Sequence, residues 1–217
     1  IRWHPAGDGK RSLLALGFTD STTGVLDVIT KKATLLGRCA DKKERTPVVD
    51  LQWDPLSQDY LLVLHDNPGI IRLLDVSART VINKFDLKSI HGVPCMASFL
   101  HSIPGGFVTV SPNSKLLTEW NVSKMTPVRS YAISTQARGI RSIKPIRLTG
   151  KYLITLQNGT VGIYDWCAHS LVHRTPPFHS ETVFDCEFQP SDKRTLATCS
   201  YDGTIKVWDI TQMKLKT

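Results

Sequence analysis

The chain has 217 residues, of which 41% are hydrophobic and 21% are charged, and its formal net charge is +8 at pH 7. This composition excludes disordered and fibrous proteins and is typical of a globular protein with a sizeable core. No stretch approaches the roughly 18 apolar residues that a membrane-spanning helix needs, and no signal peptide opens the chain. The chain starts with Ile1 rather than Met, so we expect it to be a piece of a longer protein.

Short runs of strand-forming residues, separated by turn residues, begin at the N-terminus. In the first 46 residues we predict four strands, over 1–5, 13–19, 24–30 and 33–39. The next group follows the same plan, with predicted strands over 48–54, 60–66, 70–76 and 81–87. Such groups of short strands with tight turns predict antiparallel meanders.

The pattern repeats along the whole chain. Segment 158–165 aligns with segment 202–209 without a gap, and segment 20–27 aligns too. Segment 114–121 aligns with Asn in place of the final Asp, and segment 69–75 aligns after a slightly longer turn. The residues that end these matches recur at intervals of 48, 46, 44 and 44 residues, and they are Asp27, Asp75, Asn121, Asp165 and Asp209. This period is close to the roughly 40 to 45 residues of a four-stranded propeller blade. We therefore predict one all-β domain of five blades, at about 1–46, 47–90, 91–137, 138–178 and 179–217.

The last group is the most complete. Its predicted strands cover 182–190, 195–200 and 204–210, and Asp202-Gly203 lies at a tight hairpin turn because Gly tolerates positive φ. Only eight residues follow Asp209, barely enough to begin a fourth strand.

This group resembles a WD40 repeat, whose signature dipeptide is matched by Trp208-Asp209. The resemblance implies a β-propeller of WD40-type four-stranded antiparallel blades. It also implies that four residues form the family's structural hydrogen-bonded tetrad, and these are His179, Thr198, Asp202 and Trp208. An indole N–H can only donate a hydrogen bond, so a buried Trp208 would need a hydroxyl partner such as Thr198.

Seven blades are commonest in the family that the chain resembles. We therefore expect an open arc of five blades from a seven-bladed ring, or from the first ring of a two-ring protein. Segments 48–57, 120–127 and 181–186 are similar to one subgroup of the family, long eukaryotic proteins in which WD repeats precede a helical region. That subgroup has no established enzymatic activity.

Chemistry-bearing motifs are absent from the sequence. It has no GxSxG, HExxH or GxGxxG motif, and its seven histidines form no cluster with metal-ligand spacing. We expect no catalytic residue, cofactor, metal or small-molecule substrate. The five cysteines are odd in number and scattered, which indicates reduced thiols in a cytoplasmic protein, with the nucleus as the alternative.

The positive charge is concentrated in blades one and four. The candidate partner-binding residues are basic side chains near connections between blades, namely Lys42, Lys43, Arg45, Arg138 and Arg141. They either bind acidic protein segments or RNA backbone, or they are solvated loop charge. Most tryptophans occupy repeat landmarks, which disfavours base stacking on them. We therefore expect a non-enzymatic scaffold that binds other proteins of a complex, with an RNA-associated propeller as the alternative.

Overall fold

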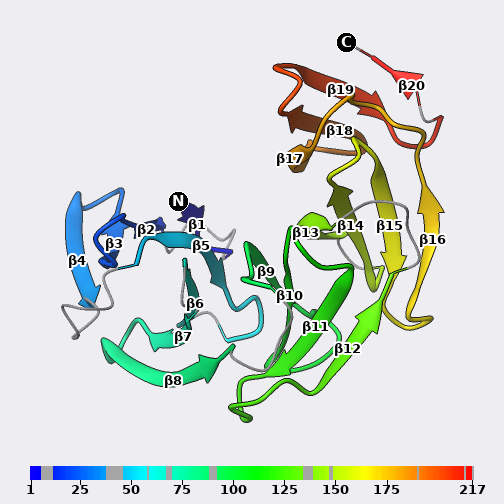
Figure 1. Cartoon of the computed structure of the whole chain (residues 1–217). Coiled ribbons are helices and arrows are strands. Elements are labelled where there is room, and N and C mark those ends of the chain that lie inside the picture. The colour runs from blue at the N-terminus through cyan, green and yellow to red at the C-terminus, as the bar shows by residue number, and fades with distance from the viewer. Residues whose placement is uncertain are drawn as a thin grey trace. The chain divides into compact units, whose positions relative to one another are not determined.

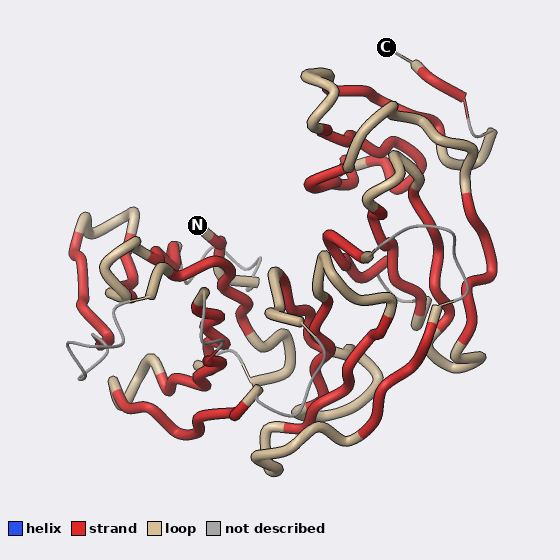
Figure 2. The backbone as a smooth tube through the Cα atoms, in the orientation of Figure 1, coloured by secondary structure: helices blue, strands red, loops and turns tan. Residues whose placement is uncertain are grey.

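The computed structural model describes residues 1–5, 12–37, 46–57, 59–66, 70–87, 92–133, 139–146, 149–189, 191–212 and 214–216. These residues form strands and turns (Figure 2), and among them no helix is long and apolar enough to cross a membrane. The strands form five four-stranded sheets, each connected in chain order (Figure 1). The predicted all-β fold with five antiparallel blades is confirmed.

The first two blades follow the predicted strands to within a few residues. Blade one consists of β1 (Arg2–Trp3), β2 (Leu13–Gly17), β3 (Thr23–Asp27) and β4 (Lys32–Gly37). Blade two consists of β5 (Val48–Trp53), β6 (Tyr60–His65), β7 (Ile70–Asp75) and β8 (Thr80–Asp86).

The other three blades repeat this plan. Blade three consists of β9 (Met96–Phe99), β10 (Gly106–Val110), β11 (Leu116–Asn121) and β12 (Arg129–Ala132). Blade four consists of β13 (Ile140–Ile146), β14 (Lys151–Leu156), β15 (Val161–Asp165) and β16 (Ser170–Arg174). Blade five consists of β17 (Val183–Gln189), β18 (Asp192–Ser200), β19 (Ile205–Asp209) and β20 (Lys214–Leu215). The last residues thus do form a short fourth strand.

The chain divides into two compact units. Unit 1 contains residues 1–109 and 118–130, and unit 2 contains residues 110–117 and 131–217. Blades one and two lie in unit 1, and blades four and five lie in unit 2.

In unit 1 both faces of blade two are buried. Leu61 of β6 packs in an apolar cluster with Ala15 of blade one, and the next residue, Leu62, packs in another cluster with Phe99 of blade three. Successive side chains of a strand point to opposite faces, so a strand buried on both faces has an almost continuous apolar sequence. This accounts for the run of apolar residues in segment 60–65.

The landmark residues that recur along the sequence cap the turn between the third and fourth strands. Asp27 Oδ1 accepts hydrogen bonds from the backbone N–H groups of Ile29 and Thr30, at 3.0 and 3.1 Å. Asp165 makes the same pair of bonds in blade four, at 3.0 and 3.1 Å. A short side chain with acceptor oxygens is needed to bond its own turn in this way, which explains why Asp or Asn recurs there.

Candidate functional site

Four side chains of blade five are joined by hydrogen bonds. Trp208 Nε1 donates to Thr198 Oγ1 at 2.9 Å, and the same oxygen lies 2.8 Å from His179 Nε2. The other ring nitrogen, His179 Nδ1, lies 2.9 Å from Asp202 Oδ2. The structure therefore brings together all four residues that the sequence places in the tetrad.

The donors and acceptors give this network a direction. A carboxylate can only accept, so His179 Nδ1 carries the hydrogen and donates to Asp202. In the neutral imidazole, Nε2 then accepts from the Thr198 hydroxyl, which itself accepts from the indole. Hydrogen bonds from the Thr204 hydroxyl, and more weakly from its backbone N–H and from His179, hold the pKa of Asp202 well below its usual range.

A hydroxyl, an imidazole and a carboxylate in series also occur in nucleophilic catalysis, but here the hydroxyl is enclosed. Thr198 is 1% exposed and His179 is 2% exposed. A nucleophile must reach its substrate and be activated by its base. Thr198 is instead held between an indole and an imidazole inside the blade, so its hydroxyl is not open to a substrate.

Neighbouring segments fix the network in place. The Phe178 ring stacks on Trp208, with 3.6 Å between the ring centroids and an interplanar angle of 11°. Gly159, in the β14–β15 turn of blade four, accepts the backbone N–H groups of Phe178 and His179 at 3.0 and 3.2 Å. Gly159 has φ +78°, and a Cβ atom there would lie 1.8 Å from the His179 carbonyl oxygen. Only glycine fits this close approach.

Blade three contains half of the same network, which the sequence reasoning missed. Trp120 Nε1 donates to Thr109 Oγ1 at 3.0 Å, and both residues are buried. Thr109 lies two residues after the strand partner of Trp120, as Thr198 lies two residues after the strand partner of Trp208. This strand pairing is the signal that identifies Thr109.

In blade four, Tyr164 takes the place of the tryptophan. It is fully buried, its hydroxyl has no hydrogen-bond partner among the described residues, and burial raises its pKa to about 12. The tetrad is thus complete in blade five and partial in blade three.

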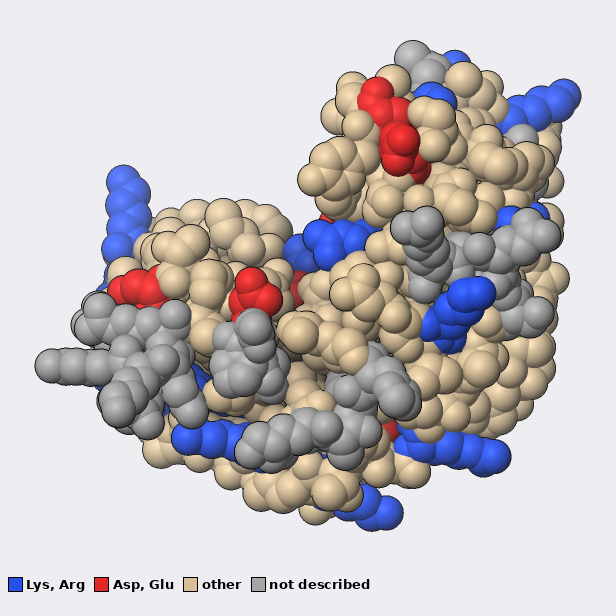
Figure 3. Space-filling view, in the orientation of Figure 1, with Lys and Arg blue, Asp and Glu red and all other residues tan. Residues whose placement is uncertain are grey.

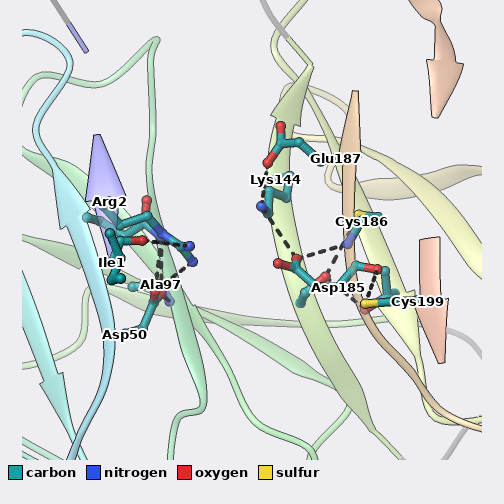
Figure 4. Close-up of polar contacts among 12 residues, drawn as sticks. Ile1, Arg2, Asp50, Ala97, Lys144, Asp185, Cys186, Glu187 and Cys199 are labelled. Carbon is teal, nitrogen blue, oxygen red and sulfur yellow. Dashed lines mark hydrogen bonds and ion pairs between the residues drawn. The ribbon is translucent and has the colours of Figure 1, made fainter. Parts of the chain in front are cut away.

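A second group of polar contacts joins the first strands of three blades in unit 1 (Figure 4). Asp50 of β5 lies just after a β-bulge, and its side chain is 3% exposed. It accepts a hydrogen bond from Arg2 of β1 at 2.9 Å and one from the Ala97 backbone N–H of β9 at 3.1 Å. Burial raises the pKa of Asp50, and the charge of Arg2 opposes that rise.

The same repeat position forms an ion pair in unit 2. Asp185 of β17 also follows a β-bulge, and Lys144 of β13 lies 3.4 Å from it and 2.7 Å from Glu187 (Figure 4). Arg2 and Lys144 occupy equivalent positions, each in the first strand of the blade preceding its aspartate. The sequence reasoning missed these pairs, although the shared Val-x-Asp spelling of 48–50 and 183–185 was a signal for the two aspartates.

Phe184, which precedes Asp185 in β17 and is partly buried, forms an aromatic pair with Tyr201. The Phe184 and Tyr201 ring centroids are 4.4 Å apart, and Tyr201 is 70% exposed. The guanidinium carbon of Arg141 lies 5.5 Å from the centroid of the Phe184 ring. Arg141 of β13, Phe184 of β17 and Tyr201 of the β18–β19 turn thus form a group of charged and aromatic side chains.

Of the five basic residues suggested as partner contacts, the structure describes only Arg141, in β13. Lys42, Lys43, Arg45 and Arg138 lie outside the described residues. On the face shown in Figure 3, the described Lys and Arg side chains lie singly or in small groups. Within the described ranges, no three His, Cys, Asp or Glu side chains lie close enough together to hold a metal ion.

Comparison with known proteins identifies the repeat. Residues 170–209 match the family model described as "WD domain, G-beta repeat". The chain is 32% identical over 92 residues to human GATOR2 complex protein WDR24, a match that covers 41% of this chain and 12% of that protein. It is 36% identical over 62 residues to WD repeat-containing protein 75 of Xenopus laevis, which covers 29% of this chain and 7% of that protein.

A solved structure shares the fold of almost the whole chain. A chain of the "Crystal Structure of Mitotic Checkpoint Complex" superposes with a TM-score of 0.74 at 15% identity, covering 98% of this chain and 60% of that one. The fold is thus a β-propeller of five four-stranded blades. The matches support the WD40 repeat family, and each of the two relatives is matched over about an eighth of its length or less.

Proposed function

We propose that the chain is a non-enzymatic protein-interaction scaffold that presents loops to partner proteins in a larger complex. The observation that carries this proposal is the exposure of Tyr201 next to Asp202 of the buried network. Because the turn is bonded internally, an exposed side chain is held in position before any partner arrives. Such preorganisation reduces the entropy lost on binding.

The relatives support partners of the protein class. GATOR2 complex protein WDR24 is by its name a protein of a complex, and its similarity covers 41% of this chain. Segments 48–57, 120–127 and 181–186 favour, within the WD40 proteins, the subgroup that includes WD repeat-containing protein 17. Free thiols at Cys167, Cys186 and Cys199 are consistent with a reducing compartment, and we propose the cytoplasm, with the nucleus as the alternative.

A cross-linked pull-down of the full-length parent protein, with and without nuclease and analysed by mass spectrometry, tests this function. We expect a defined set of proteins that survives nuclease treatment. Recovery of no defined set would contradict the scaffold.

Loss of the partners on nuclease treatment would support the RNA-associated alternative. In that case, replacing Lys42, Lys43 and Arg45 with Ala should weaken RNA binding across sequences and flatten its dependence on salt.

A further inference from the structure

The surface beside the tetrad combines acidic and aromatic side chains. We propose that this surface, the blade-five rim, binds an arginine or lysine side chain of a partner protein. The rim consists of Glu181, Phe184, Asp185, Glu187 and Tyr201. The inference rests on the proposed interaction function and names the chemistry of the partner segment.

The aromatic pair provides a face for a cation. Tyr201 is 70% exposed, and its ring lies at 41° to the Phe184 ring. Arg141 already places its guanidinium over Phe184, 5.5 Å from the ring centroid. The rings attract cations because the face of an aromatic ring is negative. The Tyr201 ring offers a second such face to solvent.

The acidic residues of the rim also favour a cationic ligand. Lys144 is shared between Asp185 and Glu187, whose side chains are 40% and 72% exposed. Glu181 is a third exposed acidic residue in the segment that leads into β17. A cationic side chain that reached the rim would therefore meet carboxylate oxygens as well as aromatic faces.

The rim is also held rigidly. Tyr201 N–H donates to the Thr182 carbonyl at 3.0 Å, and Ser200 Oγ donates to the Glu181 carbonyl at 3.2 Å. These bonds tie the β18–β19 turn to the start of β17, next to the Asp202 carboxylate of the tetrad. An extended protein segment carrying a cation fits this arrangement, because the three carboxylates of the rim outnumber Lys144 and Arg141, the two cations that already lie beside them.

An NMR titration of the chain with N-acetyl-arginine amide tests the inference. Matched probes are the uncharged N-acetyl-norleucine amide and N-acetyl-glutamate amide. We expect saturable shifts of the backbone amides in 184–187 and of Tyr201 with the arginine probe alone. Tyr201→Ala and Glu187→Gln should each weaken its binding about two- to fivefold, the range of a cation–π or exposed ion-pair contact.

The matched control is Phe18→Ala, which removes a 48% exposed aromatic ring from unit 1 and should leave arginine binding unchanged. Circular dichroism confirms that each variant is folded. Shifts no larger than those with norleucine, stronger binding of the glutamate probe, or unchanged affinity in Tyr201→Ala would overturn the inference. If arginine binding is absent while the nuclease-resistant partners are still recovered, the scaffold function stands and the cation site falls.

Discussion

The hydroxyl of Thr198 lies between an indole that must donate and an imidazole that bridges to a carboxylate. One buried atom therefore completes the hydrogen bonding of Trp208 and His179. A buried donor or acceptor that loses its partner costs more than the average hydrogen bond contributes.

Thr198→Val tests this directly, because valine has nearly the same shape but no hydroxyl. We expect the free energy of unfolding to fall by about 1–3 kcal/mol, measured by urea titration. Thr109→Val is the matched control, because the Thr109 hydroxyl accepts a hydrogen bond from Trp120 and has no bond to an imidazole among those seen in blade three. Its free energy of unfolding should fall by less than that of Thr198→Val. A Thr198→Val variant as stable as the wild type, or a larger loss in Thr109→Val, would argue against the network.

The carboxylate of Asp202 makes the stability of the fold depend on pH. Its pKa is lowered in the folded protein from an ordinary value of 3.8, so its contribution to stability is present above that value. The contribution is lost as the pH falls below 3.8 towards the folded-state pKa. At pH 7 we expect Asp202→Asn to be less stable than the wild type.

The stability difference between the two proteins should narrow as the pH is lowered from 4 to 2, because the unfolded wild type then takes up a proton at Asp202 that the folded carboxylate, with its lowered pKa, resists. Urea midpoints at several pH values measure this difference. A difference between the two proteins that stays constant with pH would mean that the charge of Asp202 contributes nothing.

At the scale of the element, the first strand of a blade carries an ion pair to the blade that follows. Asp50 is buried and also accepts a backbone N–H from a third blade, whereas Asp185 is partly exposed. The ion pair of Asp50 should therefore contribute more to stability than that of Asp185, because exposed ion pairs contribute little.

Arg2→Ala should lower the free energy of unfolding by about 1–3 kcal/mol at pH 7, less than for a fully buried pair because Arg2 is partly exposed. Burial raises the pKa of Asp50, so its ionisation opposes folding as the pH rises above 3.8. Without Arg2 the pKa rises further, and the loss should be larger at pH 7 than at pH 4.

Lys144→Ala serves as the comparison. Because the carboxylate partners of Lys144 are exposed, this variant should lower the free energy of unfolding by less than about 1 kcal/mol. Urea titrations of both variants at the two pH values provide the measurement. A loss in Arg2→Ala that is the same at pH 4 and pH 7 would show that Asp50 does not depend on this cation.

The strands could be predicted because they depend on local spacing. The turn between the third and fourth strands requires a capping residue such as Asp165, and its recurrence fixes the period of the repeat. The tetrad positions came from the resemblance of blade five to a WD40 repeat. The contacts of Asp50 could not be predicted in the same way, because its partners Arg2 and Ala97 come from other blades, 48 and 47 residues away.

At the scale of the whole molecule, the described residues form a series of blades with buried apolar clusters. The clusters account for the stability of each unit, and they leave the exposed turns and strand ends for recognition. Fold alone does not define a partner, so the functional assignment depends on the exposed residues of blade five. If the assignment is right, a partner protein contacts segments 181–187 and 200–204, which contain the residues of the rim.

Hydrogen–deuterium exchange of the chain, alone and with a partner protein recovered in the pull-down, tests this placement most directly. We predict that the partner slows exchange in segments 181–187 and 200–204, while the buried strands of unit 1 exchange as before. Unchanged exchange in both segments, with protection confined to other parts of the chain, would contradict the account.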